Sequence, residues 1–124
     1  MVDCYGCQYD TVDDLTLGYR FLEDAVKMLG VFKQSPPFIF HSPETGPNGE
    51  DWSDKRGLSG WVPLIESGIQ LHTLCAKNFI SIDYYTCSEI SDVVKKKLID
   101  LAKSYFYPKR VDSKLIKRGV DYYD

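Results

Sequence analysis

Apolar residues recur at three- and four-residue steps in two stretches of the chain, a spacing typical of amphipathic helices. The first stretch runs from Leu15 to Leu29, and Gly30 stops it. Thr11 or Asp13 can cap its start, because a side-chain oxygen there would accept a hydrogen bond from the first backbone N–H groups. The pattern therefore predicts a helix over 15–29.

The second helical stretch begins near Ser88 or Ser91, where a serine can serve as the cap. Its inward face would be formed by Val94, Leu98, Leu101, Ala102 and Tyr105. The run Lys95-Lys96-Lys97 interrupts this apolar pattern and is predicted to be a solvated face.

Shorter segments alternate apolar and polar residues or gather β-branched and aromatic residues, which predicts strands. These segments are Val2 to Tyr5, Phe38 to Phe40, Leu58 to about Glu66, Ile69 to Leu74, Phe79 to Cys87 and Arg110 to Ile116. Ser67-Gly68 is a turn signal, so the third, fourth and fifth segments should run antiparallel to one another. Ser42 to Gly57 is predicted to be a long irregular loop, and Gly119 to Asp124 shows no pattern.

This order of elements predicts one domain, residues 1–124, of the α+β class. We expect a two-layer sandwich in which a mainly antiparallel sheet carries both helices on one face. The other face would then need cover. The chain holds nine tyrosines and six phenylalanines, so we expect this face to dimerise, sheet on sheet, into a homodimer.

Composition and charge narrow the possible partners. The formal net charge is −3 and the basic residues are scattered, which argues against a nucleic-acid partner. No apolar run approaches the roughly 20 residues that cross a bilayer, so no membrane partner is expected. Met1 to Cys4 lack the basic and apolar regions of a signal peptide, which makes the cytoplasm the expected location and the four cysteines thiols.

Three side chains capable of chemistry occur in the strand region. Ser67 and His72 are five residues apart in one apolar run, and Cys87 ends the next run, so we expect them to gather near one place. Cys87 and His72 could act as nucleophile and base, and a general acid is equally compatible with that pair. Structural roles remain the alternative. The motif Glu-Ser-Gly does not match the Gly-x-Ser-x-Gly elbow of an ordinary hydrolase.

The remaining cysteines carry a weaker signal. Cys4-x-x-Cys7 has the spacing of half a zinc site or of a redox pair. It falls in or just after a strand, and no second closely spaced pair occurs, so no metal site is predicted. The sequence assigns no role to Cys4, Cys7 or Cys75.

Several motifs together resemble one known family. Ser59-Gly60, Glu66-Ser67, His72-Thr73 and Ile82 to Cys87 are similar in order and spacing to the small prokaryotic type of S-adenosylmethionine decarboxylase, a pyruvoyl enzyme of polyamine (spermidine) biosynthesis. The resemblance covers most of the chain and is strongest from Leu58 to Cys87. It implies an enzyme that acts on a small molecule and is made as a self-cleaving zymogen.

The resemblance implies a cleavage between Glu66 and Ser67. Ser67 would attack the Glu66 carbonyl, the peptide would become an ester, and elimination with hydrolysis would leave a pyruvoyl group at Ser67. Residues 1–66 would form the β chain, and residues 67–124 would form the α chain. The cofactor would thus come from the chain itself.

The same resemblance assigns roles around the cleavage site. His72 matches the processing base, and Ser59 matches a second processing residue. Once mature, the pyruvoyl group at Ser67 would form a Schiff base with the substrate amine, and Cys87 matches the proton donor. Gly68 stands where the family usually has a histidine, and a glycine there should loosen the turn.

Substrate recognition departs from the family pattern. Leu74 and Ala76 replace an aromatic residue and a glutamate that contacts ribose. Leu74 can still cover an adenine face, and Phe40 or Trp52 are candidates to stack on adenine. One alternative is pyruvoyl-dependent decarboxylation of arginine or ornithine, with Asp3 as the partner of the substrate cation. Another is an unprocessed homologue with a binding or regulatory role.

Overall fold

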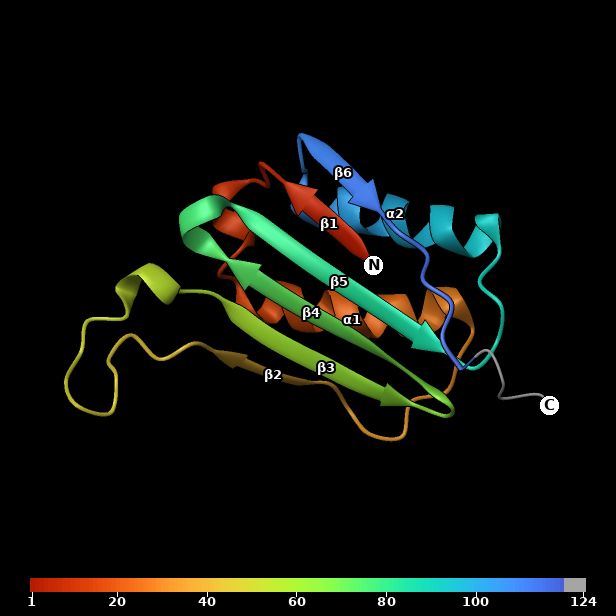
Figure 1. Ribbon diagram of the computed structural model, residues 1–124, viewed down its shortest axis with the longest axis horizontal. Helices are drawn as coiled ribbons and strands as arrows, with labels where there is room; N and C mark the ends of the chain where they lie inside the picture. The colour runs from red at the N-terminus through yellow and green to blue at the C-terminus, as the bar shows by residue number, and fades with distance from the viewer. Residues whose placement is uncertain (120–124) are drawn as a thin grey trace.

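A computed structural model describes residues 1–119 of the chain (Figure 1). The strands are β1 (Val2–Tyr5), β2 (Phe38–His41), β3 (Leu58–Leu64), β4 (Ser67–Leu74), β5 (Phe79–Thr86) and β6 (Arg110–Ser113), and the helices are α1 (Leu15–Leu29) and α2 (Asp92–Phe106). Short 3₁₀ turns are η1 (Tyr9–Thr11), η2 (Ser53–Lys55) and η3 (Cys75–Lys77). Residues 120–124 of the patternless tail lie outside the described part of the chain.

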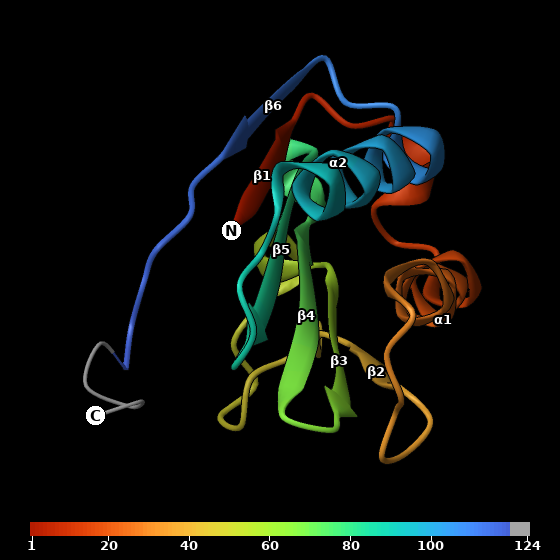
Figure 2. The same cartoon turned by 90° about the vertical axis from the view of Figure 1, so that its right-hand side faces the viewer.

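The described strands form one six-stranded sheet in the order β2-β3-β4-β5-β1-β6, with every neighbouring pair antiparallel. Both helices cover one face of this sheet, and the segment after β6 passes on the other side (Figure 2). α1 packs on β2, β3, β4 and α2. The predicted two-layer α+β sandwich with helices on one face is therefore confirmed.

The core lies between the helices and the sheet, where apolar side chains leave water. Its largest fully buried members are Phe21, Leu22, Leu58, Ile69, Leu71, Ile80, Ile82 and Phe106. On β3 and β4 the buried residues alternate with exposed ones, so each strand presents one face to the core and one to the open side. Phe106, the last residue of α2, is a core residue that the predicted inward face did not include.

The cap of α1 differs from the prediction. Asp14 is the capping residue, and its carboxylate accepts a hydrogen bond from the backbone N–H of Leu17. Asp13 is occupied elsewhere by an ion pair with Arg56, and the Thr11 hydroxyl donates to a nearby backbone carbonyl. Neither of the two predicted residues is thus available to cap the helix.

α2 is capped by Ser91, one of the two predicted serines, which accepts a hydrogen bond from the Val94 backbone N–H. The helix is joined to α1 by a hydrogen bond from the Tyr105 hydroxyl to the Asp24 carboxylate. Burial raises the pKa of Tyr105 to about 12, and the Asp24 hydrogen bond and charge add to the increase.

The turn between β3 and β4 lies two residues earlier than predicted. β3 ends at Leu64. Ile65 and Glu66 form the turn, and Ser67 and Gly68 already belong to β4. Glu66 takes the left-handed conformation with φ = 60°, which lets the tight turn close without a glycine. Gly68 is held in the sheet between Pro63 and Tyr85.

Two strand ends also differ from the prediction. β5 stops at Thr86, so Cys87 lies just beyond it. β6 stops at Ser113 and does not reach Ile116, because its partner β1 is short and Ser113 is paired with Val2, the first residue of that strand. A strand that pairs with only one neighbour ends where that neighbour ends.

A buried threonine fixes the far end of the β3–β4 hairpin. The Thr73 hydroxyl accepts a hydrogen bond from the Leu58 backbone N–H at 2.8 Å and donates one to the Val12 carbonyl at 2.5 Å. Thr73 is only 1% exposed, so both bonds are shielded from water. They tie the hairpin to the segment that precedes α1.

Candidate active site

The peptide between Glu66 and Ser67 lies at the tip of the hairpin, beside the end of β5 (Figure 1). The left-handed φ of Glu66 is uncommon for a residue with a side chain and costs conformational energy. The Glu66 carbonyl oxygen accepts a hydrogen bond of 3.2 Å from the Cys87 backbone N–H. This donor polarises the carbonyl and is placed to stabilise negative charge on its oxygen.

The Ser67 side chain is nearly buried, and its hydroxyl donates to the Ile65 carbonyl at 3.4 Å. Attack by this hydroxyl on the preceding carbonyl carbon would close a five-membered ring, a size that a serine can form with its own peptide bond. Ser67, Glu66 and Cys87 thus form one cluster at the tip of the hairpin, as their predicted roles require.

A second cluster lies near the other end of the hairpin. The Ser59 hydroxyl and His72 Nδ1 are 3.0 Å apart on paired positions of β3 and β4. Both side chains are exposed on the face of the sheet that carries no helix. A serine in contact with an imidazole can relay a proton, which is the chemistry predicted for this pair.

The structure does not bring the two clusters together within one chain. Ser67 and His72 are separated by five positions along β4, which is about 17 Å at the rise of a strand. An odd separation also sends the two side chains to opposite faces: Ser67 shares the buried side with Leu71, whereas His72 lies on the open side. The expectation that Ser67, His72 and Cys87 gather in one place is therefore wrong for a single chain.

Two predicted substrate-binding residues share the open face with His72. Phe40 is paired with Ser59, His72 is paired with Ser59 and Ser81, and Ser81 is paired with Asp3. Because directly paired residues point to the same face, these side chains form one row across β2, β3, β4, β5 and β1. The row has an aromatic end at Phe40 and an acidic end at Asp3.

The other substrate-binding candidates lie apart from this row. Leu74 is half-buried at the end of β4, and Ala76 belongs to the 3₁₀ turn that follows. Trp52 belongs to the long loop, where its backbone N–H donates to the Glu44 carbonyl at 2.7 Å and its ring lies against Gly46. Trp52 thus packs within its own loop in this structure.

Aromatic residues that the sequence did not single out cover the open face near the tip. Phe38 stacks on Trp61 with ring centroids 6.2 Å apart, and the Trp61 indole N–H donates to the Tyr85 hydroxyl at 3.1 Å. They are 48%, 41% and 37% exposed, respectively, which is high for large apolar rings. Trp61 is two residues after Ser59, and Tyr85 is four residues after Ser81, so this even spacing along the strands could have placed them on the open face.

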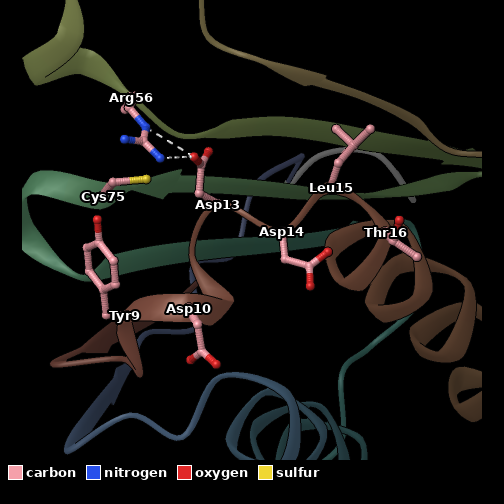
Figure 3. A pocket seen from close by; sticks show the side chains of 8 residues that line it. All are labelled: Tyr9, Asp10, Asp13, Asp14, Leu15, Thr16, Arg56 and Cys75. Atoms are coloured by element: carbon pink, nitrogen blue, oxygen red, sulfur yellow. Dashed lines mark hydrogen bonds and ion pairs between the residues drawn. The ribbon is translucent and has the colours of Figure 1, made fainter.

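A cavity of about 460 Å³ lies at the N-terminal end of α1 (Figure 3). The Asp13 carboxylate on its wall accepts hydrogen bonds from Arg56 at 2.6 and 3.1 Å and lies 3.2 Å from His41. Burial favours a higher pKa for Asp13, but the hydrogen bonds and charges of Arg56 and His41 outweigh it and lower the pKa. The residues of both clusters are absent from the lining of this cavity.

The remaining cysteines lie away from both clusters. Cys4 and Cys7 are buried, and the Cys7 thiol donates to the Cys4 carbonyl at 3.6 Å. A hydrogen bond between the two thiols lowers the pKa of Cys7 and raises that of Cys4. Burial raises the pKa of Cys75 on the cavity wall, and the Asp13 charge adds to this effect.

Two further properties of the described residues 1–119 concern metals and membranes. Within that range, no group of three or more histidine, cysteine, aspartate and glutamate side chains could hold a metal ion. No helix in the same range has the length and apolar character needed to cross a membrane.

The fold and the tip together define a class: small two-layer α+β proteins whose hairpin presents a serine behind a strained and polarised peptide carbonyl, the arrangement of a self-cleaving proenzyme. The profile of the S-adenosylmethionine decarboxylase family matches residues 1–119, and the chain belongs to that family. This confirms the resemblance seen in the sequence.

Individual relatives agree over nearly the whole chain. The S-adenosylmethionine decarboxylase proenzyme of Persephonella marina is 30% identical over 120 residues, which cover 97% of this chain and 80% of the relative. The proenzyme of Aquifex aeolicus is 28% identical over 97% of this chain and 78% of its own length. A crystal structure of the adenosylmethionine decarboxylase from Aquifex aeolicus superposes with a TM-score of 0.72 at 26% identity, over 96% of this chain and 87% of the crystallised one.

Proposed function

We propose that the protein is a self-processing, pyruvoyl-dependent decarboxylase of S-adenosylmethionine that serves polyamine biosynthesis in the cytoplasm. One observation carries the proposal: the peptide before Ser67 has a strained residue on one side and a backbone N–H donor on its carbonyl oxygen. Membership of the decarboxylase family supports the activity, and the proenzyme names of the relatives support the processing. A reducing cytoplasm would also keep the Cys87 thiol available.

In the proposed cleavage, the Ser67 hydroxyl attacks the Glu66 carbonyl carbon, and the Cys87 N–H stabilises the oxygen as it becomes negative. The peptide bond is exchanged for an ester. Loss of the Ser67 Cα proton then expels the Glu66 carboxylate, which ends the β chain at residue 66. Tautomerisation, addition of water and loss of ammonia leave the α chain, residues 67–124, with a pyruvoyl terminus.

The proton transfers in this sequence need a base, and His72 with Ser59 is the candidate pair. Within one chain the pair is about 17 Å from Ser67, so it cannot serve that residue directly. Two copies stacked through their open faces, with a two-fold axis running across the strands, would place the partner's His72 over the tip, where it would face the backbone of the Glu66–Ser67 peptide, since the Ser67 side chain points to the other side of the sheet. Face-to-face sheets lie about 10 Å apart, within reach of side chains from both sides.

The exposed rings of Phe38, Trp61 and Tyr85 support the same dimer, because pairing the open faces would remove their apolar surface from water. We therefore propose a homodimer in which each active site takes Ser67 and Cys87 from one copy and His72 and Ser59 from the other. The axis would pass near the middle of β4, between Ser67 and His72.

In the mature enzyme the pyruvoyl group supplies a carbonyl that binds the substrate amine and takes up the electrons released with carbon dioxide. Ser67 fits this role because it lies at a strand end where cleavage frees it. The Cys87 side chain is exposed beside the same tip and is proposed to protonate the substrate carbon. Its backbone and its thiol would thus act in different steps.

For the substrate, the names of the relatives support S-adenosylmethionine. Phe40 offers an exposed ring next to Ser59 and is the best placed candidate to stack on adenine. Measurement of carbon dioxide release from S-adenosylmethionine, arginine and ornithine tests this assignment. Release of carbon dioxide only from arginine or ornithine would agree with the cofactor chemistry but overturn the assignment of S-adenosylmethionine as substrate. Asp3 would then be the partner for the side-chain cation of the amino acid.

The processing itself is tested by the intact mass of the denatured protein beside a Ser67→Ala control. We expect the natural chain to give two fragments that divide between Glu66 and Ser67, the second with a blocked terminus, and the control to give one species of 14.2 kDa. A single uncleaved species in both samples after long incubation would overturn the proposal and favour a binding homologue.

A further inference from the structure

A hydrogen bond between two aromatic side chains spans β4 on the open face, one residue from the proposed cleavage site. Trp61 on β3 donates its indole N–H to the hydroxyl of Tyr85 on β5, and β4 lies between these strands. Trp61 is itself supported by the stacked ring of Phe38, and the Arg118 guanidinium lies 5.4 Å from the centre of the Tyr85 ring. The Tyr85 ring is therefore held from two sides.

Gly68 lies directly beneath this bridge. A Cβ at position 68 would be 2.2 Å from the Tyr85 hydroxyl oxygen, 2.4 Å from Cζ and 2.8 Å from Cε1, so a side chain there would require the Tyr85 ring to move. Gly68 and Tyr85 are also direct partners in the β4–β5 ladder. Glycine at this position does not leave a gap, because the Tyr85 ring fills the space that a side chain at position 68 would occupy.

The consequence concerns residue 67, whose carbonyl is bonded to the Gly68 nitrogen. Glycine has the greatest backbone freedom of any residue. A glycine next to the reacting serine would therefore by itself allow that serine to adopt several positions. A ring packed on the Gly68 Cα removes this freedom. A small displacement of a nucleophile lowers the reaction rate strongly, because attack requires close contact and alignment.

We propose that Tyr85, held by Trp61, is a positioning residue that fixes Ser67 through Gly68. The inference rests on the proposed self-cleavage and deepens it. Tyr85 contacts Gly68 and acts on the reacting residue through it. After cleavage the same contact would hold the new terminus of the α chain, which has lost its covalent bond to Glu66.

The test compares Tyr85→Phe, Trp61→Phe and the double variant with the natural chain. Cell-free synthesis is stopped at intervals, and the fraction cleaved between Glu66 and Ser67 is read from intact masses, so no substrate is involved. We expect each single variant to slow cleavage about 10-fold and the double variant to be no slower than either, because the two side chains act as one unit. Tyr9→Phe removes an exposed phenol elsewhere and should cleave at the natural rate.

A second readout separates positioning from folding. In a Ser67→Ala background, which cannot cleave, Tyr85→Phe and Trp61→Phe should shift Tm by less than about 3 °C and leave the dimer fraction in sedimentation unchanged. Among cleaved enzymes, kcat should fall while KM changes less than about 2-fold, the signature of lost alignment rather than lost binding.

The outcomes are distinguishable. A natural rate of cleavage in Tyr85→Phe, or losses that multiply in the double variant, would overturn the role of Tyr85 and leave the proposed function intact. A slower rate that is matched by a large fall in Tm or in dimer fraction would show a structural role and also overturn it. Absence of cleavage in the natural chain would overturn both proposals together.

Discussion

The proposed division of the active site between two copies predicts that two inactive chains can restore each other. A His72→Ala chain keeps its own serine and lacks the base, whereas a Ser67→Ala chain keeps the base and cannot be cleaved. Alone, each should remain a single species. In a mixed dimer, the His72→Ala chain would meet the intact His72 of the other copy, and its Glu66–Ser67 bond should break.

The size of the effect follows from the geometry. Within one chain His72 is about 17 Å from Ser67 along β4, so it contributes nothing to cleavage of its own chain. Random pairing of two chains in equal amounts puts about half of the His72→Ala chains in mixed dimers, so about half of them should be cleaved. The Ser67→Ala chains should stay whole.

The assay is co-expression of the two chains with tags of different mass, followed by denaturing mass spectrometry. Recovery of both tags through either one confirms that mixed dimers have formed. A shared active site is excluded if mixed dimers are present and the His72→Ala chain remains uncleaved. A shared site is also excluded if His72→Ala cleaves alone at the natural rate, because His72 would then have no part in the reaction.

Three further predictions concern single residues. Thr73→Val leaves two buried backbone groups without partners and should lower the free energy of unfolding by about 3 kcal/mol in urea titrations, whereas Thr73→Ser keeps the hydroxyl and should lose much less. Folding raises the pKa of Tyr105 from 10.0 to about 12, so its contribution to the free energy of unfolding is present below pH 10 and should be lost between pH 10 and 12. In Tyr105→Phe the free energy of unfolding should therefore change less with pH over this range. Cys87→Ser keeps the backbone N–H and should still self-cleave, while carbon dioxide release falls by about 100-fold; loss of cleavage would show that the thiol itself acts in processing.

Much of the fold could be predicted because the local patterns agree with the tertiary structure. α1 has the predicted bounds, since its apolar spacing and its glycine stop leave little choice. Its cap could not be predicted: Thr11, Asp13 and Asp14 can all supply an oxygen, and the choice depends on Arg56, 43 positions away from Asp13, which occupies that carboxylate. Long-range contacts of this kind cannot be inferred from the residues near the start of the helix.

The turn between β3 and β4 was misplaced for a similar reason. Serine and glycine together favour turns, and glutamate has no preference for the left-handed conformation that Glu66 adopts. In the structure Gly68 stays in the strand because Tyr85 packs on it from the next strand. The strained glutamate is then left at the tip, where the proposed chemistry needs strain.

The candidate site shows which part of a motif carries information. Residue identities and order were enough to select Ser59, Ser67, His72 and Cys87, but closeness in sequence was a poor guide to closeness in space. In a strand, side chains five positions apart point to opposite faces, so Ser67 and His72 cannot meet within their own sheet. A second sheet facing the first removes the separation along the strand, because two-fold symmetry brings the far end of the partner's β4 over the backbone of the tip. The same spacing that prevents catalysis by one chain therefore supports an active site shared by two.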